Sequence, residues 1–167
     1  MPVTAMGSEP NTRVTETLGT RFTVAHDNWM ADGDRFLRPV ADADATFWER
    51  WAGMRYVGDQ LLPRFQVERI LLVELRAFLT PEMNERLWMQ ADRLTRLLGA
   101  FGRLGRQRES ARELALTTRE LLEAFRLWYA EIELAAGGIR WSDVSREGIR
   151  LLAELDPTRC GWADAHV

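Results

Sequence analysis

The sequence of 167 residues is 46% hydrophobic and 28% charged, which is typical of one folded globular domain and excludes wholesale disorder. Its net charge of −3 favours neither nucleic acid nor a membrane surface as a partner. All 22 basic residues are arginine, so reactions and phosphate sites that require a lysine are excluded.

The chain carries no pattern that predicts export or membrane insertion. Its single cysteine, Cys160, cannot form an internal disulfide, which fits a reducing compartment. Residues 1–14 lack the apolar stretch of a secretory signal. The most apolar run, residues 70–75, is far shorter than the ~20 residues that cross a bilayer. We therefore expect a cytoplasmic protein with no transmembrane segment.

Proline, glycine and aspartate are frequent in residues 1–45, which we predict to form an N-terminal arm with little regular structure. Only residues 20–25 indicate a short extended piece, because apolar Phe22 and Val24 alternate with polar neighbours. The arm also contains large apolar side chains that need burial, namely Phe22, Trp29, Phe36 and Leu37.

Three patterns predict helix starts in the rest of the chain. Each places a threonine or serine before a helical run, where its hydroxyl can cap the free amides of the first turn. The patterns are Thr46 with Glu49, Thr80 with Pro81, and Ser110 with Glu113. A further helical segment, 64–79, follows Pro63, whose ring is expected to kink or restart the helix.

Apolar spacing predicts which side chains enter the core. Phe47 and Trp51 fall at helical spacing after the first cap, and we expect both, with Trp48, to be buried. The clearest periodicity follows the third cap, where apolar residues alternate spacings of three and four over about four heptads. This seam consists of Ala111, Leu114, Thr118, Leu121, Phe125, Trp128, Ile132, Ala135 and Ile139.

The end of the chain predicts one more short helix. Gly137 and Gly138 are expected to close the preceding helix through a left-handed residue. A last helix is then predicted over residues 142–155, before Pro157 and an irregular tail.

These elements predict an all-α fold, an antiparallel bundle of four to five helices. The two longest helices, 81–105 and 110–137, are joined by a short turn and must form an antiparallel hairpin. The predicted organisation is an irregular arm (1–45), a helical bundle (46–156) and a C-terminal tail (157–167).

No pattern in the sequence predicts catalysis. The two histidines, His26 and His166, stand in the arm and in the tail, so no Glu-x-x-His metal motif exists. None of the four serines lies in a Gly-x-Ser-x-Gly motif, and the paired acids are explained by solvated helix faces. We expect no catalytic residue, no metal site and no cofactor.

Arginine concentrates around the turn of the long hairpin, since residues 61–130 hold 12 arginines and 9 acidic residues. This charge can face phosphate, an acidic protein or the chain's own acidic arm. The candidate contacts to an anionic partner are Arg96, Arg103, Arg106, Arg108 and Arg112.

Large aromatic residues in the irregular segments either fasten those segments to the bundle or anchor a partner. The candidate partner-binding residues are Phe22, Trp29, Phe36, Trp141 and Trp162. The function we predict is a non-enzymatic interaction or scaffold subunit of a larger assembly, whose partner is another protein subunit or a second copy of this chain. The alternatives are a nucleic-acid-binding helical subunit, which the acidic total disfavours, and a small-molecule sensor with an apolar pocket inside the bundle.

Overall fold

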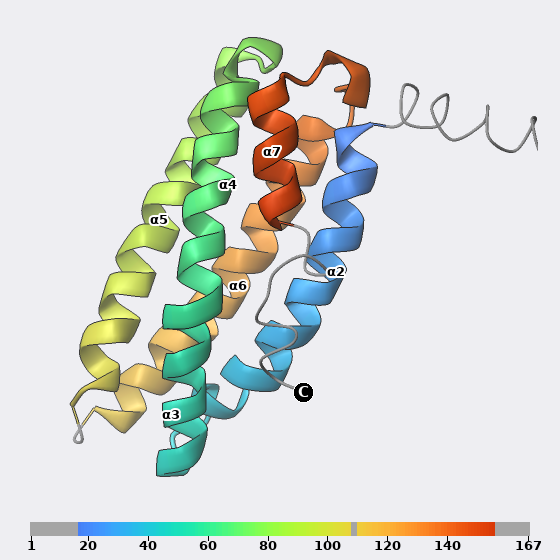
Figure 1. Cartoon of the computed structure of the whole chain (residues 1–167). Coiled ribbons are helices and arrows are strands. Elements are labelled where there is room, and N and C mark those ends of the chain that lie inside the picture. The colour runs from blue at the N-terminus through green and yellow to red at the C-terminus, as the bar shows by residue number, and fades with distance from the viewer. Residues whose placement is uncertain (1–16, 108–109, 156–167) are drawn as a thin grey trace, which may run out of the picture.

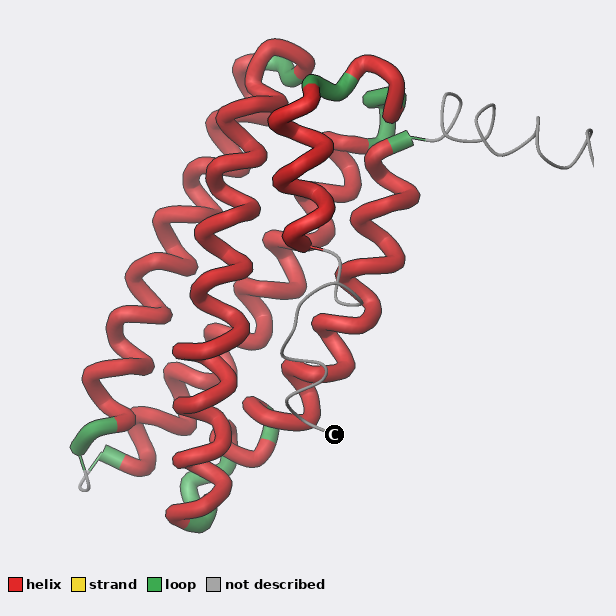
Figure 2. The backbone as a smooth tube through the Cα atoms, in the orientation of Figure 1, coloured by secondary structure: helices red, strands yellow, loops and turns green. Residues whose placement is uncertain are grey.

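The computed structural model describes residues 17–107 and 110–155, and this part of the chain is almost entirely helical (Figure 2). Within these residues six α-helices form, in the order α2 (Leu18–Leu37), α3 (Phe47–Tyr56), α4 (Leu62–Leu75), α5 (Pro81–Gly105), α6 (Ala111–Ala136) and α7 (Arg146–Leu155). Short 3-10 turns occur at Pro39–Ala41, Arg76–Phe78 and Trp141–Asp143. The predicted all-α fold is confirmed.

The long helices run alternately up and down the bundle (Figure 1). The α5–α6 hairpin and the α2–α6 pair make the most extensive helix contacts, and α7 packs beside α4. An isolated antiparallel bridge joins Thr17 to Arg140, and the amide of Leu18 donates to the carbonyl of Ile139 at 2.8 Å. These contacts fix the start of α2 against the segment that follows α6.

The irregular arm and the extended piece that the sequence predicts are wrong for residues 18–37, which form α2 and belong to the bundle. The buried positions of its second half are His26, Trp29, Gly33 and Leu37, which recur at helical spacing. His26 is polar and Gly33 has no side chain, so the sequence does not show an apolar stripe at these four positions. The predicted arm over residues 1–16 lies outside the described residues.

Two of the three predicted caps are confirmed. The hydroxyl of Thr46 accepts from the amide of Glu49 at 3.1 Å, and the Glu49 carboxylate accepts from the amide of Thr46 at 2.9 Å. Thr80 accepts from the amide of Met83 at 3.2 Å. The third prediction is wrong, because the hydroxyl of Ser110 donates to the side chain of Gln107 and does not cap α6.

The helix does not restart at Pro63, because α3 continues into α4 through a π-helical turn over Val57–Leu61. Proline lacks an amide hydrogen, and in an α-helix its ring would clash with the carbonyl of Asp59 four residues earlier. A wider turn just before Pro63 relieves this clash while the helical path is kept. The buried face of this long helix starts at Gly53 and Tyr56.

The seam of α6 is confirmed, since all its members except the two alanines are buried. Phe65 of α4 packs its ring edge-on against Phe125 and Trp128, with ring centroids 6.3 and 5.4 Å apart. The helix ends at Ala136, but Gly137 has φ of −59° and Gly138 has no positive φ either, so the left-handed closure expected there is wrong.

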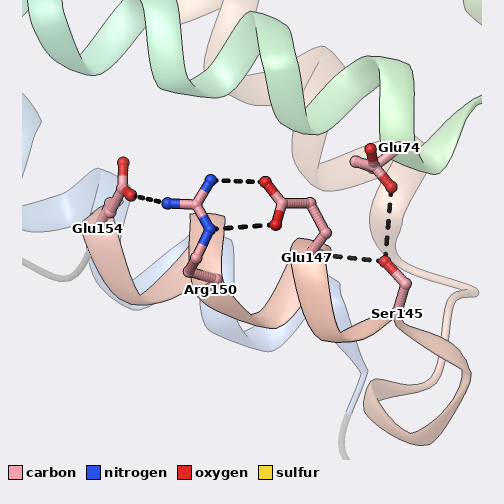
Figure 3. Close-up of polar contacts among 6 residues, drawn as sticks. Glu74, Ser145, Glu147, Arg150 and Glu154 are labelled. Carbon is pink, nitrogen blue, oxygen red and sulfur yellow. Dashed lines mark hydrogen bonds and ion pairs between the residues drawn. The ribbon is translucent and has the colours of Figure 1, made fainter.

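The short helix α7 begins at Arg146, four residues later than predicted, after the 3-10 turn Trp141–Asp143. Hydrogen bonds link charged side chains on its exposed side (Figure 3). The guanidinium of Arg150 donates to the carboxylates of Glu147 and Glu154 along the helix. The Arg150 guanidinium, by donating hydrogen bonds, lowers the pKa of the Glu147 carboxyl. At the start of the helix, the hydroxyl of Ser145 accepts from the amide of Gly148 at 3.1 Å.

Candidate functional site

Three adjacent aromatic side chains are exposed at the start of α3. We call them the aromatic patch: Phe47 is 62% exposed, Trp48 70% and Trp51 49%. Their rings contact one another edge to face, with centroid distances of 5.2 Å for Phe47–Trp48 and 6.1 Å for Trp48–Trp51. The prediction that these residues enter the core is therefore wrong.

A polar contact holds one side of the patch. The guanidinium of Arg55 lies 5.3 Å from the ring centroid of Trp51, and its Nε bonds Asp59 at 3.0 Å. The capping box of Thr46 and Glu49 fixes the first turn of the same helix. The patch is therefore built on an ordered helix start at one end of the bundle (Figure 1).

An acidic hollow of about 310 Å³ lies beside the patch, where the end of α2 and the following loop meet the start of α3. Its lining residues are Asp34, Arg38, Pro39, Asp42, Asp44, Ala45 and Glu49. Arg38 is paired with Asp34 at 2.8 Å, which leaves three carboxylates in the lining without a balancing cation there. Glu49, which lines the hollow, directly follows Trp48 in the first turn of α3, so both features belong to the start of the same helix.

A second polar feature, the buried cluster, lies inside the bundle and joins three helices. Glu68 of α4 has a fully buried side chain, and its carboxylate lies 3.5 Å from Nε2 of His26 on α2 and 3.4 Å from Nε1 of Trp128 on α6. Nδ1 of the same histidine lies 3.1 Å from Glu133, and its ring stacks on Tyr129 at 4.1 Å.

Arg64 completes the buried cluster one helical turn before Glu68, with its Nη2 3.9 Å from that carboxylate. Its guanidinium also lies 4.2 Å from the ring centroid of Trp29 and 5.0 Å from that of Tyr129. Nε and Nη1 of Arg64 and the hydroxyls of Tyr56 and Tyr129 are buried without a hydrogen-bond partner in the described part of the chain.

Burial raises the pKa of both tyrosines well above the ordinary value. For Tyr129 the Arg64 guanidinium opposes this effect and the Glu68 carboxylate adds to it. For Tyr56 the Asp32 carboxylate is the next largest cause after burial. The buried cluster thus keeps its phenols neutral and links α2, α4 and α6 by polar contacts.

The predicted partner-binding residues are not brought together. Trp29 is buried within the bundle beneath Arg64, so its assignment to a partner is wrong. Phe36 is half-buried and stacks on Tyr56, with ring centroids 5.1 Å apart. The side chains of Phe22 and Trp141, and the whole of Trp162, lie outside the described residues.

Four of the predicted anion-contacting arginines, Arg96, Arg103, Arg106 and Arg112, are exposed around the turn between α5 and α6. Arg108 lies outside the described residues. Neighbouring helices therefore do not bury this charge.

Comparison with protein-family models, with curated proteins and with solved structures finds no match. Over the described ranges, no helix is long and apolar enough to cross a membrane. In the same ranges, no group of three or more histidine, cysteine, aspartate or glutamate side chains is placed to hold a metal ion.

The sequence contained one signal for the surface that its apolar spacing misassigned. Three aromatic residues fall within five positions, 47 to 51, directly after the acidic stretch around Asp42 and Asp44. Positions 47, 48 and 51 lie within about 100° of one another around a helix, so their spacing marks one face but does not tell whether that face is buried or exposed.

Proposed function

We propose that this chain is a non-enzymatic, protein-binding helical module that engages a partner through the aromatic patch. The observation that carries the proposal is the exposure of Phe47, Trp48 and Trp51 side by side. Single exposed apolar residues are ordinary, whereas a contiguous apolar patch is a mark of an interaction site. Tryptophan is also among the residues that contribute most to binding energy at protein interfaces.

The acidic hollow supports a particular kind of partner, a protein segment that carries both apolar and basic side chains. Apolar groups would cover the indoles of Trp48 and Trp51, while an arginine or lysine would meet the carboxylates of Asp42 and Asp44. The same carboxylates disfavour a membrane as the partner, because biological surfaces of anionic lipid repel them.

Photo-crosslinking in the native cell tests where the partner binds. A benzophenone side chain in place of Trp48 is expected to crosslink one protein, and the same group in place of exposed Leu116 on α6 is expected not to. The crosslinked protein, once purified, should bind the full chain. Equal crosslinking from both positions would contradict the proposal.

Affinity measurements with that purified partner test the energetics. The double variant Trp48→Ser/Trp51→Ser is expected to bind at least about 30-fold more weakly, because interface tryptophans each contribute about 2 kcal/mol or more. Leu134→Ser, at another exposed apolar position, is the matched control and should bind normally. Unchanged affinity of the double variant would overturn the proposal.

Nucleic-acid binding is the second candidate, and the exposure of Arg96, Arg103, Arg106 and Arg112 supports it. Binding through these side chains would weaken steeply with salt, because each phosphate contact releases counterions. Replacing Arg103 and Arg106 with glutamine would then flatten the salt dependence. We expect no binding to duplex DNA or to single-stranded RNA at physiological salt, and a salt-dependent micromolar affinity would favour this candidate.

A further inference from the structure

A groove of about 830 Å³ lies along one side of the bundle, between the π-helical turn with the start of α4 and the second half of α5. Its apolar lining comes from both sides, from Val57, Leu62 and Phe65 on one and from Leu98 and Phe101 on the other. The volume falls within the range of ordinary small-molecule sites.

Glycines keep the groove open. A Cβ atom added at Gly58, Gly99 or Gly102, which all line the groove, would meet no atom within 4 Å. Each glycine in a helix interior costs about 1 kcal/mol relative to alanine. Gly105 differs, because a Cβ there would lie 2.0 Å from the sulfur of Met54. The three open glycines therefore preserve space that no side chain of the described chain fills.

The charge of the groove is entirely positive. Arg69, Arg103 and Arg106 line it, and no aspartate or glutamate does. In residues 17–107 and 110–155, Nε of Arg69 is buried without a hydrogen-bond partner, and its guanidinium lies 5.8 Å from the ring centroids of Phe65 and Trp88. A buried guanidinium nitrogen without a hydrogen bond is costly, and an anion is a strong acceptor for it.

We propose that this groove binds an amphipathic anion, a small molecule with one alkyl or acyl chain and a carboxylate or phosphate head group. The alkyl or acyl chain of this ligand covers the apolar lining and occupies the space over Gly99 and Gly102. The head group bonds the arginines at the edge. This site is separate from the aromatic patch, and neither proposal depends on the other.

Calorimetric titration of the full chain tests the ligand class with three probes of equal chain length: decanoate, decyl phosphate and decanol, each below the concentration at which it aggregates. We expect one of the two anions or both to bind at a single site, at least about tenfold more tightly than decanol, because decanol lacks the charge-assisted hydrogen bonds. Binding by decanoate alone would define a carboxylate ligand, and binding by decyl phosphate alone a phosphate ester. Equal binding of all three probes, or no binding of either anion, would overturn the proposal.

Variants then locate the site. Gly102→Leu should fill the groove and abolish binding, while circular dichroism and thermal unfolding show a folded chain of equal or higher stability. Ala100→Leu enlarges a residue of α5 outside the groove lining and is the matched control. Gly99→Leu replaces Gly102→Leu if that variant does not fold. Unchanged anion affinity in a folded filled variant contradicts the assignment.

Charge variants test the head group. Arg103→Gln with Arg106→Gln should weaken anion binding about tenfold and leave decanol binding unchanged. Arg96→Gln, which removes an exposed arginine of α5 outside the groove lining, should change neither. An equal loss from the Arg96 variant would mean that general charge, and not the groove, attracts the probe. A peptide partner instead of a small molecule would appear as absence of binding by all three probes, which also overturns the proposal.

Discussion

The indole Nε1 of Trp128 donates a hydrogen bond to the carboxylate of Glu68 at 3.4 Å, and both side chains are fully buried. The two residues belong to α6 and α4, which also pack through Phe65 and Phe125. Because a buried polar pair is satisfied in one alignment only, we expect this contact to favour the observed register of the two helices.

Loss of the Glu68 carboxylate should be strongly destabilising. In Glu68→Leu the indole of Trp128 loses its acceptor and the guanidinium of Arg64 loses its nearest anion. We expect a loss of about 3–5 kcal/mol in the free energy of unfolding, measured by urea denaturation, because removal of one partner leaves an uncompensated buried charge. Glu68→Gln, which keeps a hydrogen-bond acceptor, should cost less.

The double variant Arg64→Met/Glu68→Leu provides the control for this effect. It removes both charges and should recover part of the loss, since an apolar pair of similar volume is often tolerated. Strict additivity of the two single changes would show that the charges do not interact across their 3.9 Å separation.

The stability of the protein should fall as pH rises above about 10. Burial raises the pKa of Tyr56 and Tyr129 in the folded chain, whereas in the unfolded chain both phenols titrate near 10. Above that pH the unfolded chain releases protons that the folded chain retains, so the free energy of unfolding drops by up to about 1.4 kcal/mol per pH unit for each tyrosine. Below that range the contribution is constant.

The sequence simplifies the interpretation of this measurement, because these are its only two tyrosines and there is no lysine to titrate in the same pH range. Urea denaturation between pH 8 and 11 should show the decline, and Tyr56→Phe/Tyr129→Phe should flatten it. Ultraviolet absorbance should detect no tyrosinate until the chain unfolds. Tyrosinate that forms near pH 10 in the folded chain would contradict the buried placement of the phenols.

Regular apolar spacing predicted α6 correctly, because a seam with residues such as Leu121 and Phe125 needs no knowledge of its partner helices. It failed for α2, where His26 holds a core position. A histidine is compatible with burial here because Glu68 and Glu133 supply polar contacts, and these lie 42 and 107 positions further along the chain. Single-segment periodicity cannot detect partners at that distance.

The aromatic patch could not be recognised for a related reason. Trp48 and Trp128 have the same hydrophobicity, yet one is 70% exposed and the other fully buried. Their difference arises from position in the bundle, since Trp128 faces Phe65 in the middle and Trp48 stands at the free start of α3. Local sequence predicts an aromatic helix start, but only the tertiary arrangement decides which rings meet solvent.

Truncation of the seam should show that α6 is the centre of the core. Phe125→Ala is expected to lower the free energy of unfolding by about 3–5 kcal/mol, because the ring is buried and packs on Phe65 and Tyr129. Leu134→Ala on the same helix is exposed and should change stability by no more than about 0.5 kcal/mol. Similar losses in both variants would contradict the orientation of α6.

Two glycines on helices should respond oppositely to alanine. At Gly53 an added Cβ would lie 2.6 Å from Cγ2 of Val40 and 3.1 Å from the carbonyl oxygen of Phe36. Val40 is buried and β-branched, so it cannot turn away easily. The overlap should cost more than the ~1 kcal/mol of helix propensity that alanine contributes, and Gly53→Ala should lower stability.

At Gly99 the added methyl meets no atom within 4 Å, so helix propensity acts alone and Gly99→Ala should raise stability by about 0.5–1 kcal/mol. Urea denaturation midpoints of the two variants should therefore move in opposite directions from that of the parent chain. A loss at Gly99 would mean that the groove is narrower than described, with a side chain already over the glycine. A gain in stability at Gly53 would mean that Phe36 and Val40 do not lie in close contact with α3. The shape described for the acidic hollow, which is lined by the end of α2, the following loop and the start of α3, would then also be wrong.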